Sequence, residues 1–62
     1  MTIVYFVVAG DKSSRAYDDY FECLECLAYI SETDPELDAR LVAVDSHMAG
    51  EYLRMPQLTP SK

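Results

Sequence analysis

Residues 15–31 read RAYDDYFECLECLAYIS, and this stretch decides the fold. When each residue is placed 100° from the last, the apolar side chains gather on one arc and the charged side chains on the opposite arc, as in an amphipathic helix. The apolar arc comprises Tyr17, Tyr20, Phe21, Leu24, Leu27 and Ala28. A period of two would instead mix carboxylates with aromatic residues on one face. The spacing therefore predicts a helix over residues 15–31, capped by Ser13 or Ser14.

Two apolar runs flank this helix and predict strands. Residues 2–9, TIVYFVVA, carry β-branched and aromatic side chains on both alternating sets, as expected of a strand covered on both faces. Residues 40–45, RLVAVD, have the β-branched density of a second strand. Between the helix and this strand, Pro35 suits the first position of a short helical turn at 35–38, with Asp34 as its cap.

Residues 51–55 are ambiguous between strand and helix. As a strand they would form a hairpin with residues 40–45. As a helix begun at Ser46 they would bring Met48, Tyr52 and Met55 onto one side, at the cost of a glycine in the interior. The strand is favoured, because two strands alone make a poor sheet.

These elements predict a small single α+β domain over residues 1–55, ordered β-α-β-β, with one amphipathic helix packed on a small sheet. Residues 56–62 contain two prolines and end in Ser-Lys, which predicts a loose C-terminal tail. A chain of 62 residues has room for one core only. Because so small a core gives marginal stability, a partner or a homodimer is an expected supplement.

Composition limits where the chain works and what it binds. The longest apolar run, residues 3–9, is far shorter than the roughly 20 residues that span a bilayer, and no basic segment precedes it as in a secretory signal. We therefore expect a cytoplasmic protein with no membrane association. The net charge of −6 argues against direct binding to nucleic acid or to an anionic membrane, so the expected partner is basic.

No motif predicts catalysis or a cofactor. Cys23 and Cys26 have CxxC spacing, but they lie in the middle of the predicted helix and not at its N-terminus, where the dipole would lower a thiol pKa. Zinc needs four ligands, and His47 is the one attractive addition to the two cysteines. The glycines are isolated, so no phosphate-binding loop is present. We expect no enzyme, no metal site and no cofactor, and a thiol or zinc protein remains the third alternative.

The most informative feature is a run of carboxylates. Between Ala16 and Ala39 there are eight of them and no Lys or Arg, namely Asp18, Asp19, Glu22, Glu25, Glu32, Asp34, Glu36 and Asp38. On a helix that rises about 1.5 Å per residue, the first four would lie along roughly 10 Å. That density approaches one strand of duplex DNA, which carries a phosphate about every 3.4 Å. Tyr29 projects onto the same arc and would serve as an aromatic anchor.

The uncompensated charge suggests a partner, because like charges one turn apart destabilise a helix by a few tenths of a kcal/mol. A solvated face that only keeps the domain soluble is the alternative, and acidic residues near a helix start also interact favourably with its dipole. The eight carboxylates and Tyr29 are the predicted partner-binding residues.

In size, acidity, single-domain make-up and lack of an enzymatic motif, the chain resembles small phage-encoded inhibitors of bacterial defence, particularly anti-CRISPR proteins that mimic DNA. The resemblance covers the whole chain in character and includes no diagnostic motif. It implies a stoichiometric inhibitor whose acidic surface occupies the basic cleft where a CRISPR surveillance complex, of a type I kind, admits target DNA. Such a cleft already favours closely spaced negative charge.

Two other readings compete with this one. An inhibitor of a restriction enzyme or of RNA polymerase would have the same acidic surface. A small oligomeric interaction module would instead pair through an apolar strand edge and would tolerate charge reversal on the helix.

Overall fold

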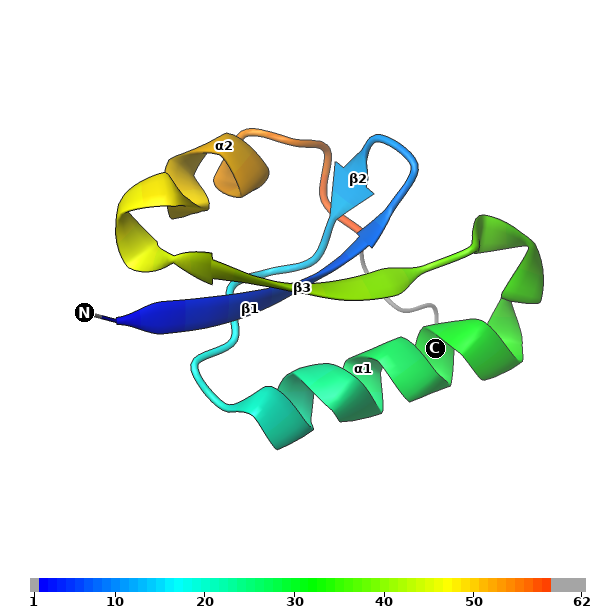
Figure 1. Cartoon of the computed structure of the whole chain (residues 1–62). Helices are drawn as coiled ribbons and strands as arrows, with labels where there is room; N and C mark the ends of the chain where they lie inside the picture. The colour runs from blue at the N-terminus through cyan, green and yellow to red at the C-terminus, as the bar shows by residue number, and fades with distance from the viewer. Residues whose placement is uncertain (1, 59–62) are drawn as a thin grey trace.

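The computed structural model of the chain describes residues 2–58. Three strands form an antiparallel sheet in the order β2-β1-β3, and two helices cover it (Figure 1). The strands are β1 (Ile3–Ala9), β2 (Lys12–Ser13) and β3 (Arg40–Asp45). The helices are α1 (Tyr20–Thr33) and α2 (Ala49–Leu53). The 3-10 turn η1 (Pro35–Leu37) follows α1, and the 3-10 turn η2 (Ser46–Met48) leads into α2. The predicted α+β class is confirmed, as are the first strand, the strand at residues 40–45 and the helical turn after Pro35.

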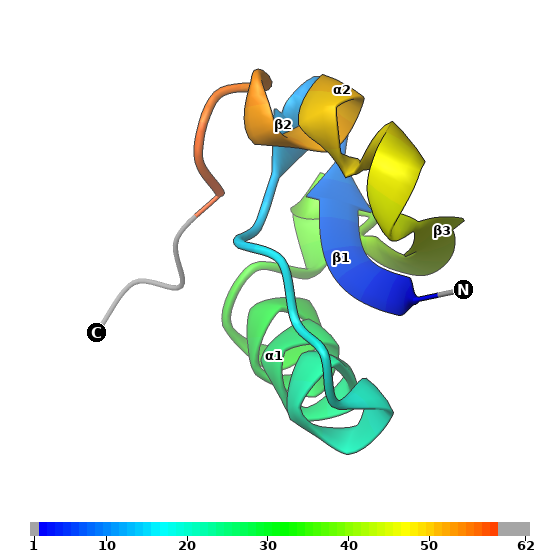
Figure 2. The same ribbon diagram turned by 90° about the vertical axis from the view of Figure 1, so that its left-hand side faces the viewer.

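The sheet is covered on both faces, because α1 and α2 lie on opposite sides of it (Figure 2). On the α1 side, Val7 and Ala9 join the buried residues of the helix in one core cluster. On the α2 side, Phe6 and Val8 pack with Ala49. The uninterrupted apolar run of β1 is thus explained, since alternate side chains of this central strand enter different clusters.

Residues 46–53 form helical structure, so the favoured prediction of a strand at residues 51–55 is wrong and the alternative of a helix begun at Ser46 is correct. The Asp45 side chain accepts a hydrogen bond from the His47 N–H at 3.0 Å and starts the turn. The Tyr52 ring then stacks on Phe6 with centroids 5.0 Å apart. This helix covers a sheet face that a hairpin would have left open.

The third strand is β2, which the sequence pattern does not predict. It follows a tight turn in which Gly10 has φ +61°, a conformation that glycine adopts without a steric penalty. β2 pairs only Lys12 and Ser13 with the end of β1. Its two residues are too few to carry a strand pattern in the sequence.

Helix α1 begins at Tyr20, five residues later than predicted, and neither Ser13 nor Ser14 caps it. Tyr17 and Tyr5 instead exchange both backbone hydrogen bonds, at 2.7 and 2.8 Å. Ser14 donates its N–H to the Val7 carbonyl and accepts the Val7 N–H on its Oγ. The segment before α1 therefore runs along β1 and satisfies backbone groups of the central strand.

The buried face of α1 also differs from the predicted apolar arc. Cys23, Cys26 and Ile30 are buried, whereas Phe21 and Leu24 are exposed. The helix is thus rotated by about 100°, one residue's step, from the predicted orientation. Two constraints explain this rotation: Tyr17 is held by β1, and the Tyr20 ring lies edge-on to the Tyr5 ring, with centroids 5.5 Å apart.

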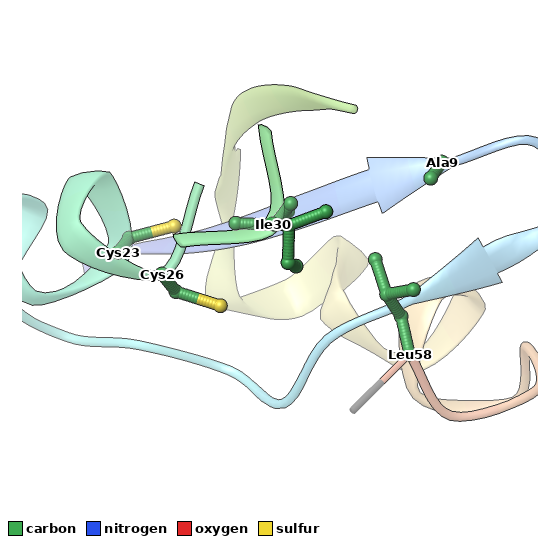
Figure 3. Close-up of a cluster of buried hydrophobic side chains, with 6 residues drawn as sticks. Ala9, Cys23, Cys26, Ile30 and Leu58 are labelled. Atoms are coloured by element: carbon green, nitrogen blue, oxygen red, sulfur yellow. The ribbon is translucent and has the colours of Figure 1, made fainter. Parts of the chain in front are cut away.

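The domain does not end at residue 55, because part of the predicted tail is built into it. Leu58 is buried in the same cluster as Ala9, Cys23, Cys26 and Ile30 (Figure 3). Its N–H donates to the Ser13 carbonyl at 2.8 Å, and the Ser13 N–H donates to the Pro56 carbonyl at 3.0 Å. The rest of the predicted tail, residues 59–62, lies outside the described residues.

Candidate acidic interaction surface

The candidate surface is built on α1, whose ends are fixed by local capping. The Asp19 carboxylate accepts the Phe21 N–H at 2.9 Å and satisfies one of the unpaired donors of the first turn. At the other end the Asp34 N–H donates to the Ile30 carbonyl at 2.8 Å. The helix is therefore a defined rod that presents one side to solvent and packs the other on the sheet.

All eight predicted carboxylates are exposed, and we call them together the acidic surface. Two precede α1, three lie on it, and three lie within or directly beside η1. In that order they are Asp18 and Asp19, then Glu22, Glu25 and Glu32, then Asp34, Glu36 and Asp38. They extend along the full length of α1 and beyond both of its ends.

The charge on α1 itself is sparser than the sequence predicted. Because the helix starts at Tyr20, Asp18 and Asp19 are not on it, and only three carboxylates lie on a helix of 14 residues, which is about 21 Å long. The predicted density of a single phosphate strand along four helical carboxylates is therefore wrong. Any resemblance to a nucleic acid has to come from the whole acidic surface, including the residues around η1.

The carboxylates of the acidic surface are only slightly neutralised by basic side chains of the same chain. Within residues 2–58 the one ion pair joins Arg15 Nη2 to Glu22 Oε1 at 4.0 Å, and both side chains are more than half exposed. An exposed pair of this length contributes about 0–1 kcal/mol at most. Arg15 also lies over the Tyr17 ring, 4.0 Å from its centroid. The other carboxylates of the acidic surface are exposed, and no cation of residues 2–58 forms an ion pair with them.

The most exposed aromatic residue beside the carboxylates is Phe21, although its place on the apolar arc predicts that it is buried. Phe21 is 70% exposed and Tyr20 43%, and their rings meet edge-on with centroids 5.5 Å apart. Tyr29, the predicted anchor, is half-buried. The sequence contained a sign of this difference, because the helix has more apolar residues than it can bury. Besides the six residues of the predicted apolar arc it carries Cys23, Cys26 and Ile30, and one face of a short helix cannot bury all of them.

The two cysteines are buried packing residues of α1, and the thiol of Cys23 is protonated at neutral pH. Burial raises the pKa of Cys23 to about 11, and the neighbouring Cys26 adds to the effect. Burial likewise raises the pKa of Tyr17 to about 12, with a further contribution from its hydrogen bond to Cys26. A thiol with a raised pKa is a poor nucleophile and a poor metal ligand at neutral pH.

Metal-ligating side chains do not cluster in the described part of the chain, where no group of three or more His, Cys, Asp or Glu could hold an ion. Across residues 2–58, no helix has both the length and the apolar character that crossing a bilayer requires.

No model of a protein family, no curated protein and no solved structure matches the chain. The chemistry of the acidic surface is therefore the basis on which a function is proposed.

Proposed function

We propose that this protein is a stoichiometric inhibitor, without enzymatic activity, that presents its acidic surface to the nucleic-acid-binding cleft of a basic complex. A CRISPR surveillance complex of the bacterial cytoplasm, met by a phage-encoded protein, is the partner that best fits its size and charge. The observation that carries the proposal is the exposure of eight carboxylates along and around α1. Among the described residues, Glu22 alone of the eight is paired, weakly, with a cation.

The physical basis is competition for positive charge. A cleft lined by Lys and Arg attracts closely spaced anions, and electrostatic steering raises the rate at which an acidic protein meets it. Phe21 would supply the apolar contact that an acidic surface lacks, since exposed aromatic residues are favoured anchors at protein interfaces. Charge would thus guide the encounter, and the Phe21 ring would slow dissociation of the complex.

Charge reversal on the outer side of α1 tests the proposal. We expect Glu25→Lys/Glu32→Lys to weaken capture of a CRISPR effector complex by on the order of tenfold or more, because opposite charges become like charges at the contact. The matched control is Asp11→Lys/Glu51→Lys, which changes the net charge equally at exposed positions in the β1–β2 turn and on α2. Neither pair includes Asp19, which caps α1, or Glu22, which pairs with Arg15.

The measurement is competition between the protein and target DNA for the purified complex. The native chain and the control should prevent duplex binding, the Glu25→Lys/Glu32→Lys variant should not, and inhibition should weaken as salt rises. Equal inhibition by all three proteins would overturn the proposal. Phe21→Ser should weaken inhibition while leaving the fold intact, since the side chain is mostly in solvent.

A further inference from the structure

The outer edge of β3 is open for pairing. Within residues 2–58, β3 is the last strand of the sheet on the side opposite β2. It pairs with β1 in one continuous register, so no bulge interrupts it. Its sequence, RLVAVD, has charges only at its ends and no proline. Natural edge strands usually carry charged residues, prolines or bulges that prevent pairing, and the interior of β3 has none of them.

The backbone hydrogen bonds of β1 show which N–H and C=O groups of β3 point away from the sheet. The backbone N–H and C=O groups of Tyr5 and Val7 bond to the segment before α1, on the side away from β3. Their partners across the ladder are Ala43 and Leu41. Opposite residues in an antiparallel pair alternate between bonded and non-bonded, so Ala43 and Leu41 direct their N–H and C=O groups away from β1.

The side of α1 nearest this edge is apolar and carries no carboxylate. Glu22 reaches Arg15, and Arg15 belongs to the segment along the other edge of β1. Tyr20 and Leu24 lie on the opposite flank of the helix, toward β3, and are 43% and 38% exposed. Ala43, on the same face of the sheet, is exposed and has only a methyl group. The acidic chain thus has an uncharged surface on which a second copy could dock without repulsion.

We propose that β3 pairs antiparallel with β3 of a second copy of this chain, around a two-fold axis at Ala43. Leu41 then lies opposite Asp45 of the second copy, and the outward backbone groups of Leu41, Ala43 and Asp45 all gain partners. In this register the β3 side chains that face α1 in one copy lie on the same face of the joint sheet as those that face α1 in the other copy, as an antiparallel pair requires. The result is a continuous six-stranded sheet.

The α1 helices also come within reach of each other in this dimer. Strands lie about 4.8 Å apart, and α1 packs against both β1 and β3. The two α1 axes would therefore be about 10 to 14 Å apart, at or just above the usual 8–10 Å of packed helices. Tyr20 and Leu24 of both copies fill this space beneath the small Ala43 side chains. The carboxylates of both helices stay on the outside.

Sedimentation and hydrogen exchange of the full chain test the proposal. The native protein should sediment at twice its 7.0 kDa mass as concentration rises. The amides of Leu41 and Ala43 should exchange quickly in the monomer and become protected with dimerisation. The amides of Val42 and Val44, which already bond to β1, should be protected at every concentration.

Two lysine substitutions on α1 form a matched pair. Leu24→Lys should abolish the dimer, because it places a charge at the contact. Phe21→Lys should leave it intact, because Phe21 is more exposed than Leu24 and its position on the helix is about 60° further from the β3 side. Methylation of the Ala43 backbone nitrogen in synthetic protein should also abolish the dimer while keeping the β1–β3 ladder, since that N–H faces outward.

A monomer at all concentrations would overturn the proposal, and so would a dimer in which the Ala43 amide stays unprotected or Phe21→Lys is the disruptive variant. Protection of Ala43 only on binding a different protein would show that the edge serves a partner strand and not a second copy. Salt separates this proposal from the inhibitor proposal: screening should strengthen self-association of a chain of charge −6 and weaken binding to a basic cleft.

Discussion

Asp19 and Asp18 are adjacent carboxylates with different structural roles. Asp19 caps α1 by accepting the Phe21 N–H, whereas Asp18 is exposed and caps no helix. We expect Asp19→Ala to lower the free energy of unfolding by about 1 kcal/mol, and Asp18→Ala to change it by less than about 0.5 kcal/mol. Urea denaturation of both variants measures the difference. Equal effects would mean that the cap contributes nothing to stability.

Cys23 and Tyr17 make the stability of the fold sensitive to alkaline pH. Their pKa values rise from the ordinary 9.0 and 10.0 to about 11 and about 12 in the fold. The unfolded chain therefore loses these protons at lower pH than the folded chain, and stability falls as pH increases from about 9 to 12. Denaturant unfolding across this range should show the decline. Cys23→Ala should reduce its slope between pH 9 and 11, and an unchanged slope would contradict the assignment.

At the scale of elements, the segment before α1 acts as a fourth, irregular strand. Ser14 provides the acceptor for the buried Val7 N–H through its Oγ at 2.9 Å. We expect Ser14→Ala to cost about 1–3 kcal/mol, because the buried N–H is left without a partner. Ser14→Thr keeps the hydroxyl and is the control. Faster exchange of the Val7 amide in Ser14→Ala alone would identify the cause, and equal stability of the two variants would contradict it.

At the scale of the whole molecule, the C-terminal segment closes the core. Leu58 is 6% exposed and lies in the cluster under α1. Leu58→Ala should cost about 2–5 kcal/mol. A domain of this size has a total stability of about 3–9 kcal/mol at 0.05–0.15 kcal/mol per residue. Thermal unfolding should show a large fall in the unfolding temperature for Leu58→Ala. Leu53→Ala should change that temperature little, because the Leu53 side chain is 61% exposed. A chain ended after Met55 that melted like the full protein would contradict this role.

The sequence by itself determined the elements with strong local signals and the exposure of the charged residues. β1, β3, η1 and the body of α1 follow from periodicity, β-branched density and Pro35. The eight carboxylates are exposed because burial of an unpaired charge costs far more than any packing gain could offset. These features depend on residues that are close in sequence, so a short stretch of the chain is enough to predict each of them.

Tertiary contacts alone decided where α1 begins, which of its faces is buried, how residues 46–55 fold and whether Leu58 joins the core. Each choice depends on backbone hydrogen bonds or side-chain contacts between distant segments, such as those of Tyr17 with Tyr5 and of Tyr52 with Phe6. The helix has more apolar residues than a three-stranded sheet can cover, so its pattern fits two orientations. The pairing of Tyr17 with β1 selects the one that leaves Phe21 in solvent.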